Sequence, residues 1–245
     1  MSSFIADNPA TAASPSPEDL RAQLQDAPVT KQLPLLPSLM ALGEAGQAVL
    51  MDFLLSHRDS PTLATGRAYQ LLRSLDKAPS IQTFLETHFP QGIYPLPSAC
   101  QVDYSEIQTH LGRQAFEAAD RLTLQKMCAL AGPNAVKRKW LYFTEVANFP
   151  TIDLQTLDQL WLLYSEGRFG FSRQRELWLG VGKNWEKLWP KIAWKKDNVW
   201  TRYPNEFIWD LSAPVGHLPL SNQLRGVRVM EALLVHPAWT ADMTP

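Results

Sequence analysis

The chain has 245 residues, of which 45% are hydrophobic, and its formal net charge at pH 7 is −1. This length suits one large or two modest domains with a real core. The near-zero charge argues against general nucleic-acid binding, which needs a broadly basic face. No apolar run is long enough to span a bilayer, so we expect a soluble protein. Cys100 and Cys128 match no metal or redox spacing and are expected to be reduced thiols of an intracellular protein.

The first 16 residues are small, polar and rich in proline, and they lack the charged and apolar regions of a signal peptide. We expect residues 1–16 to be a disordered tail and the compartment to be a bacterial cytoplasm. Ser16, Pro17 and Asp19 then predict the start of a helix, because they supply an N-cap, a proline at the first helical position and a carboxylate in the first turn.

Helical spacing of leucine and alanine predicts an N-terminal helical bundle over residues 17–90. The expected helices cover 17–25, 30–57 with breaks at the prolines and glycines, 60–75 and 80–88. The segment ALGEAGQAVLMDFLL, residues 41–55, resembles the antiparallel helix pairs of HEAT-type repeats. Such repeats usually serve as docking scaffolds.

A proline-rich stretch without periodicity, residues 91–101, marks the expected linker to a core domain over residues 102–240. Asp103 and Glu106 match a capping box at the first core helix. The predicted helices of this domain are 103–111, 114–131, 153–165 and 172–178, and a long aromatic loop covers about 195–220. No β-branched alternation is present, so we predict an all-α fold with long loops.

Tryptophan is concentrated in residues 184–228, where indoles alternate with lysines: Trp185, Trp189, Trp194, Trp200 and Trp209. Flat apolar groups mixed with positive charge are the composition of a site for a flat anion. The alternative is a satellite core, in which the indoles pack on one another and the lysines extend outward. Composition alone favours the satellite core.

No catalytic pattern emerges from the chain. The five histidines, His217 among them, have no second histidine or carboxylate at ligand spacing, and we interpret them as surface or capping residues. The sequence GVGK at residues 180–183 lacks the full phosphate-loop pattern and is interpreted as a helix C-terminus. Ser212 and Ser221 have no motif around them that activates a nucleophile. An enzyme is therefore disfavoured.

The last helix is predicted from Asn222 to about Val235. Arg225 and Arg228, three residues apart, would lie side by side on it, with Asn222 one turn earlier. Glycine inside a helix costs about 1 kcal/mol relative to alanine, so Gly226 is expected to mark a close approach by another segment or a ligand. The arginines would then grip a planar ring system bearing carboxylates. The alternative is a solvated arginine pair on a core helix.

Several of these segments resemble one known family. They are WLYFTEV (140–146), GRFGFSRQRELWL (167–179), LWPKIAWKKDNVWTRYP (188–204), FIWDLSAPVGHLPLSNQLRGVR (207–228) and HPAW (236–239), and they are similar to the core domain of the Genomes Uncoupled Four family. The N-terminal helices resemble the extra bundle of cyanobacterial members. The resemblance implies an all-α core with a cupped ligand cleft that binds protoporphyrin IX or Mg-protoporphyrin IX. It also implies activation of magnesium chelatase in chlorophyll biosynthesis.

The positions that contact the ligand in this family fall here on Phe143, Val146, Trp200, Phe207, Asn222, Arg225 and Arg228. Tyr203 stands where the family carries a second tryptophan, and its smaller ring is expected to loosen the grip on the macrocycle. The resemblance further implies a non-catalytic protein that presents porphyrin to the porphyrin-binding large subunit of the chelatase and associates peripherally with the thylakoid membrane. We expect a monomer with no nucleic-acid partner.

No His or Cys cluster is present in the sequence, so we expect no intrinsic metal, and any magnesium should arrive inside the porphyrin. Asn222 either reaches the axial position of that magnesium or caps the last helix, and both roles stay open. Two other function classes also stay open. One is a carbohydrate-binding module with exposed indoles, and the other is a single-stranded nucleic-acid binder that combines basic and aromatic residues.

Overall fold

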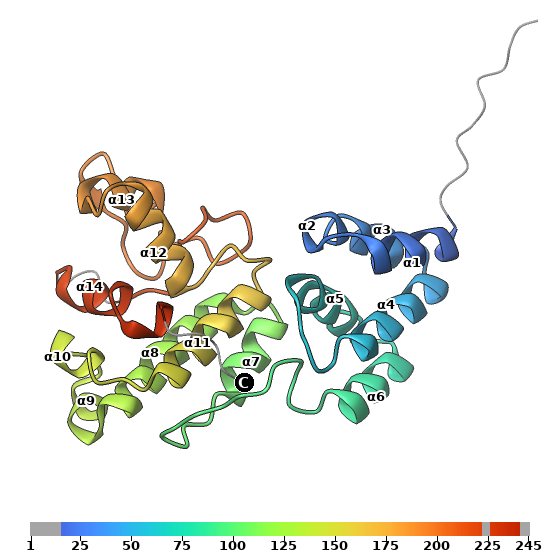
Figure 1. The fold of residues 1–245 in the computed structure, drawn as a ribbon, viewed down its shortest axis with the longest axis horizontal. Helices are drawn as coiled ribbons and strands as arrows, with labels where there is room; N and C mark the ends of the chain where they lie inside the picture. Colours follow the sequence, from blue (N-terminus) through green and yellow to red (C-terminus); the bar gives the residue numbers. More distant parts are fainter. Residues whose placement is uncertain (1–15, 222–225, 241–245) are drawn as a thin grey trace, which may run out of the picture.

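A computed structural model describes residues 16–221 and 226–240 of the chain. Helices dominate these residues, which confirms the all-α prediction, and the sheet in this part of the chain is one two-stranded hairpin (Figure 1). Within the two described ranges, no helix is both long and apolar enough to cross a membrane. The expected tail, up to residue 15, and the candidate positions Asn222 and Arg225 lie outside the described residues.

Residues 16–90 form a bundle of six helices, coloured blue to teal in Figure 1. Ser16 caps the first helix as predicted, because its hydroxyl accepts the Asp19 amide at 3.2 Å while the Asp19 carboxylate accepts the Ser16 amide. The helix predicted from residue 60 begins instead after Thr62, whose hydroxyl accepts the Thr65 amide at 3.3 Å. The bundle consists of α1 (Pro17–Asp26), α2 (Val29–Gln32), α3 (Leu35–Ala41), α4 (Glu44–Ser56), α5 (Leu63–Arg73) and α6 (Pro79–His88).

The described residues after residue 90 form the core, coloured green to red in Figure 1. Its helix α8 packs against α7 and α9, and the Asp120 carboxylate on α8 accepts the amide of Leu220, at the end of the aromatic loop, at 2.6 Å. The elements are α7 (Ser105–Gly112), α8 (Phe116–Ala131), α9 (Pro133–Arg138), α10 (Phe143–Val146), α11 (Thr151–Leu163), α12 (Phe171–Gly180), α13 (Trp185–Lys191), β1 (Lys195–Lys196), β2 (Val199–Trp200), α14 (Arg228–Leu234) and the 3₁₀ helix η2 (Pro237–Trp239).

The structure corrects two predicted helix starts. Asp103 does not form a capping box with Glu106, because its carboxylate accepts the backbone amide two residues on, at 2.8 Å, and so makes a local turn before α7. The last helix begins at Arg228 rather than at Asn222. Gly226 has a φ of 86°, in the left-handed region that a right-handed helix does not contain.

The hairpin of β1 and β2 opens the long aromatic loop. The two strands are antiparallel, and Lys195 pairs with Trp200 while Lys196 pairs with Val199. The two turn residues have positive φ, at 49° for Asp197 and 64° for the residue that follows. Asp and Asn are favoured in such two-residue turns, because their short polar side chains tolerate that conformation. Sequence patterning missed this hairpin because each strand has only two residues.

Helix α5 joins the bundle to the core by packing against α7 and α11. The buried Gln70 amide donates to the carbonyl of Leu111 at 2.9 Å and to that of Tyr164 at 2.7 Å. Gly66 lets the helices approach so closely that a Cβ would lie 1.9 Å from the Leu163 carbonyl oxygen. One continuous hydrophobic core therefore runs through both parts.

The stretch predicted as a linker, residues 91–101, is bound to the core by buried polar side chains. Asp153 accepts the Ser98 hydroxyl at 2.5 Å and the Ala99 amide at 3.0 Å. Gln108 accepts the Tyr94 amide at 2.9 Å and donates to the Tyr94 carbonyl at 3.0 Å. These bonds fix the extended backbone against α7 and α11, although its sequence has no periodicity.

Candidate ligand-binding cleft

The tryptophans after α12 form a stacked ladder beneath the aromatic loop. Trp185 lies 5.1 Å from Trp189, and Trp189 lies 5.8 Å from Trp194 with an interplanar angle of 6°. Trp189 and Trp194 are buried, and the Trp194 indole donates to the His217 carbonyl at 2.8 Å. The satellite-core interpretation therefore describes these indoles. Their role is to support the loop, because their faces are already covered.

His217 is buried, so its interpretation as a surface or capping residue is wrong. Its Nε2 accepts the Ile208 amide at 3.1 Å, which leaves the proton on Nδ1, 2.6 Å from the Ile192 carbonyl. Burial lowers the pKa of His217 because the charged imidazolium is poorly solvated there. The neutral ring thus ties both sides of the aromatic loop together.

The hairpin margin, residues 199–209, carries three of the predicted ligand contacts. Trp200 is half-buried against Trp189, with ring centroids 5.4 Å apart. Phe207 is buried and lies 5.1 Å from the His217 ring. Tyr203 is exposed and lies 6.3 Å from Phe207. Trp200 and Tyr203 therefore present ring surface to solvent, while the buried Phe207 packs behind Tyr203.

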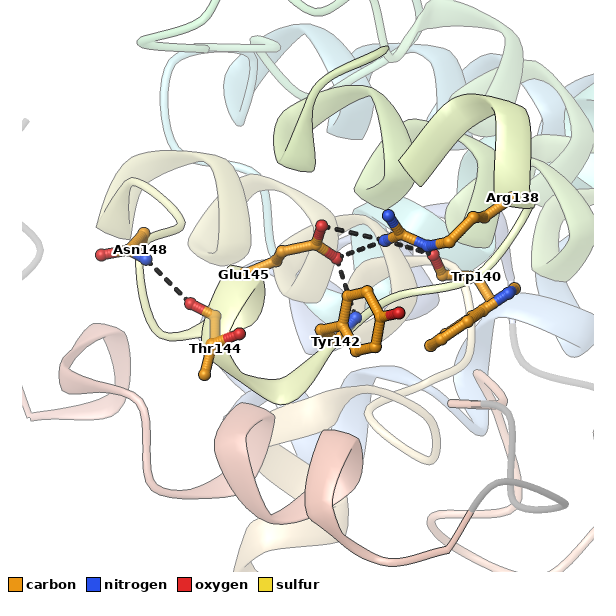
Figure 2. Close-up of polar contacts among 6 residues, drawn as sticks. All are labelled: Arg138, Trp140, Tyr142, Thr144, Glu145 and Asn148. Carbon is orange, nitrogen blue, oxygen red and sulfur yellow. Dashed lines mark hydrogen bonds and ion pairs between the residues drawn. The ribbon is translucent and has the colours of Figure 1, made fainter. Parts of the chain in front are cut away.

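The α9–α10 margin, residues 136–146, is held by an arginine clamp (Figure 2). Arg138 Nη2 lies 2.9 Å and 2.7 Å from the two Glu145 carboxylate oxygens, and the Tyr142 amide donates to the same carboxylate at 2.8 Å. The guanidinium also lies over two rings, 4.8 Å from the Trp140 centroid and 4.4 Å from the Tyr142 centroid. Charge pairing and cation–π stacking together fix this short loop.

Three more predicted contacts, Phe143, Val146 and Arg228, lie where α10 packs against α14. Val146 is fully buried between these helices, whereas Phe143 is exposed. The Arg228 guanidinium lies 5.4 Å from the Phe143 ring centroid. No described segment approaches Gly226 closely, because a Cβ there would meet no atom of the described residues within 4 Å, and the positive φ accounts for a glycine at this position.

A cavity of about 490 Å³ lies between α8 and α9. Burial raises the pKa of the Tyr203 hydroxyl, the Asp120 and Glu117 carboxylates on α8 raise it further, and Arg121 on the same helix lowers it. Burial also raises the pKa of the Cys128 thiol to about 11, although the charge of Arg138 lowers it in part. The cavity therefore lies on α8 between the hairpin margin and the α9–α10 margin. Its lining residues are Arg121, Leu124, Gln125, Cys128, Val136 and Lys139.

Sequence reasoning missed these lining residues, because they belong to helices that it treated only as core elements. One structural feature does mark the surroundings of the cavity as a binding surface. Six of the nine large hydrophobic side chains exposed in the described residues belong to its two margins, and such clustering is typical of a binding surface. The six are Val136, Tyr142, Phe143, Val199, Tyr203 and Ile208. Across the described ranges, no three His, Cys, Asp or Glu side chains gather as a metal site.

The chain matches a family described as GUN4-like over residues 97–237 and an ARM-like repeat domain described as GUN4-N terminal over residues 10–90. The second match agrees with the helical-repeat prediction for the bundle. A Ycf53-like protein from Synechocystis is 54% identical over 224 residues, which cover 91% of this chain and 96% of that protein. A chloroplastic tetrapyrrole-binding protein from Arabidopsis thaliana is 40% identical over 149 residues, 57% of this chain and 56% of that protein.

Solved structures agree with these relatives. GUN4 from Chlamydomonas reinhardtii has a TM-score of 0.57 and 40% identity, covering 60% of this chain and 95% of that one. The ligand-free structure of Arabidopsis thaliana GUN4 has a TM-score of 0.52 and 39% identity, covering 56% of this chain and 95% of that one. Since the family match spans more than half of the sequence and the Synechocystis relative aligns over nearly all of it, this chain belongs to the GUN4-like family.

Proposed function

We propose that this protein binds a tetrapyrrole, with protoporphyrin IX and Mg-protoporphyrin IX as its ligands, in the cavity between the two margins. The observation that carries the proposal is that apolar cavity, with exposed rings on both sides and cations among its lining residues. Its volume of about 490 Å³ falls within the ~300–1,000 Å³ typical of small-molecule sites. The name of the Arabidopsis relative supports the ligand class.

A rough energy balance indicates why apolar contact alone is insufficient. Burying on the order of 300 Å² of macrocycle at roughly 25 cal/mol per Å² contributes about 7 kcal/mol. Association costs of ~4–15 kcal/mol oppose this gain. Charged side chains must therefore bind the ligand carboxylates, at about 1.5–3 kcal/mol for each charge-assisted hydrogen bond.

In this proposal the predicted contacts divide into two groups. Phe143, Trp200 and Tyr203 touch the macrocycle directly, because each presents ring surface to solvent. Val146 and Phe207 act from behind, because both are buried. The predicted ligand roles of Asn222, Arg225 and Arg228 rest on the family resemblance, and the first two of these residues lie outside the described part of the chain.

The protein itself is proposed to be non-catalytic. It presents porphyrin to the porphyrin-binding large subunit of magnesium chelatase and so activates this enzyme in chlorophyll biosynthesis. We place it in the cytoplasm as a monomer, with peripheral attachment to the thylakoid membrane. In this division residues 17–90 form a stabilising or docking domain, residues 91–101 a connection, and residues 102–240 the porphyrin-binding domain.

The first test is a titration of the intact protein with protoporphyrin IX and its magnesium form, followed by the Soret band and by tryptophan quenching. Saturable binding with a shifted Soret band is expected. An unchanged Soret band would contradict the proposal and favour the carbohydrate-binding alternative. Steeply salt-dependent binding to a single-stranded polynucleotide would favour the nucleic-acid alternative instead.

The second test separates activation from binding. The protein is added to a purified magnesium chelatase at limiting porphyrin, and the rate of magnesium insertion is measured. We expect the rate to rise with protein concentration. If a protein that binds porphyrin leaves the rate unchanged, the activator role is wrong while tetrapyrrole binding stands.

A further inference from the structure

Two cations line the cavity from opposite helices. Arg121 lies on α8 one turn before the apolar floor at Leu124, and Lys139 directly follows the last residue of α9. Both side chains belong to exposed residues. Among the described residues, no carboxylate lies close enough to form an ion pair with either of them.

These two residues differ from the arginine that the sequence favoured. Arg228 lies over the Phe143 ring at 5.4 Å and is not among the described residues that line the cavity. Arg138, the last residue of α9, is already paired with the Glu145 carboxylate at 2.7 Å. Among the described lining residues, Arg121 and Lys139 are therefore the cations whose charge is available to an anionic ligand.

We propose that Arg121 and Lys139 bind the carboxylate groups of the tetrapyrrole, while Leu124, Cys128 and Val136 contact the face of its ring. This assignment rests on the proposed function and deepens it. A guanidinium forms two parallel hydrogen bonds with a carboxylate, and an ammonium attracts one as a point charge. Two cations on separate elements match a ligand that carries two flexible carboxylate arms around a flat apolar body.

The test uses one ligand with its carboxylates free and the same ligand with them blocked. Deuteroporphyrin IX and its dimethyl ester are titrated, in identical detergent-containing buffer, into the intact parent and into Arg121→Gln, Lys139→Gln and the double variant. Each single substitution should weaken diacid binding about five- to thirtyfold, the loss of one partly exposed charge-assisted bond. Ester binding should stay within about twofold of the parent, since the ester carries no charge for these residues to bind.

Lys137→Gln is the matched control, because Lys137 is an exposed α9 lysine that is not among the described lining residues. It should bind both ligands like the parent. Arg228→Gln tests the competing assignment, and it should affect the diacid less than Arg121→Gln does.

Two results would overturn the inference. One is parent-like diacid binding by both Arg121→Gln and Lys139→Gln, which would place the carboxylates elsewhere. The other is an equal loss of diacid and ester, which would show that the side chains act on the ring or on the fold. A parent protein that binds neither porphyrin would instead overturn the proposed function itself, and the inference with it.

Discussion

The junction between the bundle and the core differs from the cavity in how completely its groups are paired. At the junction, Gln70 donates to two buried carbonyls, and Gly66 brings two helix backbones into contact. At the cavity, the side chains of Tyr142, Phe143 and Tyr203 stay exposed, and Arg121 and Lys139 have no ion-pair partner among the described residues. The junction is complete without a ligand, whereas the cavity presents groups that a ligand would complete.

Two ion pairs make this comparison measurable. Arg67 and Glu166 lie 3.2 Å apart at the junction, with side chains 22% and 29% exposed. Arg138 and Glu145 lie 2.7 Å apart beside the cavity, with side chains 23% and 22% exposed. Their burial is nearly the same, so their stabilities should be similar, at about 1 kcal/mol or less each. Only the second pair holds rings that face the proposed ligand.

The largest expected effect is on the junction. Gly66→Ala forces a methyl group into the Leu163 carbonyl and should lower the free energy of unfolding by about 3 kcal/mol, or roughly 6–12 °C in Tm. Porphyrin affinity at room temperature should change less than about twofold, because the cavity is made by other helices. Gly180→Ala is the control, since a Cβ there meets no atom within 4 Å. An unchanged Tm in Gly66→Ala would show that the helices do not pack as described.

The next effect separates the two ion pairs. Arg138→Gln should weaken porphyrin binding about tenfold, because it releases both the carboxylate and the stacked rings of the α9–α10 margin. Arg67→Gln should lower Tm by a similar small amount and leave the affinity at the parent value. Thermal unfolding and Soret titration of both variants measure the two effects. Equal affinity losses would erase the distinction between the regions.

A third effect concerns pH on the cavity side. Burial raises the pKa of Asp120 to about 7, and its carboxylate accepts the Leu220 amide at 2.6 Å. Because the folded pKa exceeds the unfolded value of 3.8, the stabilisation is complete below about pH 4 and is lost as pH rises through about 7. Asp120→Asn cannot ionise, and it should raise Tm by several degrees at about pH 8 with little change near pH 4. A parallel pH profile for parent and variant would refute this account.

The smallest effect is at Tyr203, which packs edge-on against Trp209 at 5.9 Å and remains exposed. Tyr203→Trp enlarges the ring surface of the hairpin margin and should tighten porphyrin binding about two- to fivefold. Tyr203→Phe should bind like the parent, because the hydroxyl is not needed for stacking. Weaker binding by the tryptophan variant would mean that the larger ring obstructs the cavity.

Long periodic elements were predictable from this sequence, and short or irregular ones were not. The predicted helix 114–131 matches α8 (Phe116–Ala131), because its apolar positions repeat over several turns. The four-residue α10 has no such repeat, and it forms because α14 packs on it and Glu145 accepts the Tyr142 amide. Short helices depend on tertiary contacts that no local pattern records.

The residues of the candidate site differ in the same way in how visible they are from the sequence. Aromatic candidates such as Tyr203 belong to a stretch rich in aromatic residues, which can be recognised from the sequence alone. Arg121 and Cys128 carry no such signal. They line the cavity only because α9 lies opposite α8, which no local sequence pattern records. The prediction that the last helix runs through Gly226 was wrong, since glycine occurs both inside helices and at positive φ, and only the backbone angle of 86° distinguishes them.

The most direct measurement fills the cavity without disturbing the core. Val136 lines the cavity and is 50% exposed, and Val235 is 56% exposed at the end of α14, outside the described cavity lining. Val136→Trp and Val235→Trp are titrated with deuteroporphyrin IX by Soret absorbance beside the parent, with Tm measured for each. We predict that Val136→Trp loses at least about tenfold in affinity, while Val235→Trp matches the parent and both keep its Tm. Parent-like binding by a folded Val136→Trp would contradict the claim that this cavity is the tetrapyrrole site.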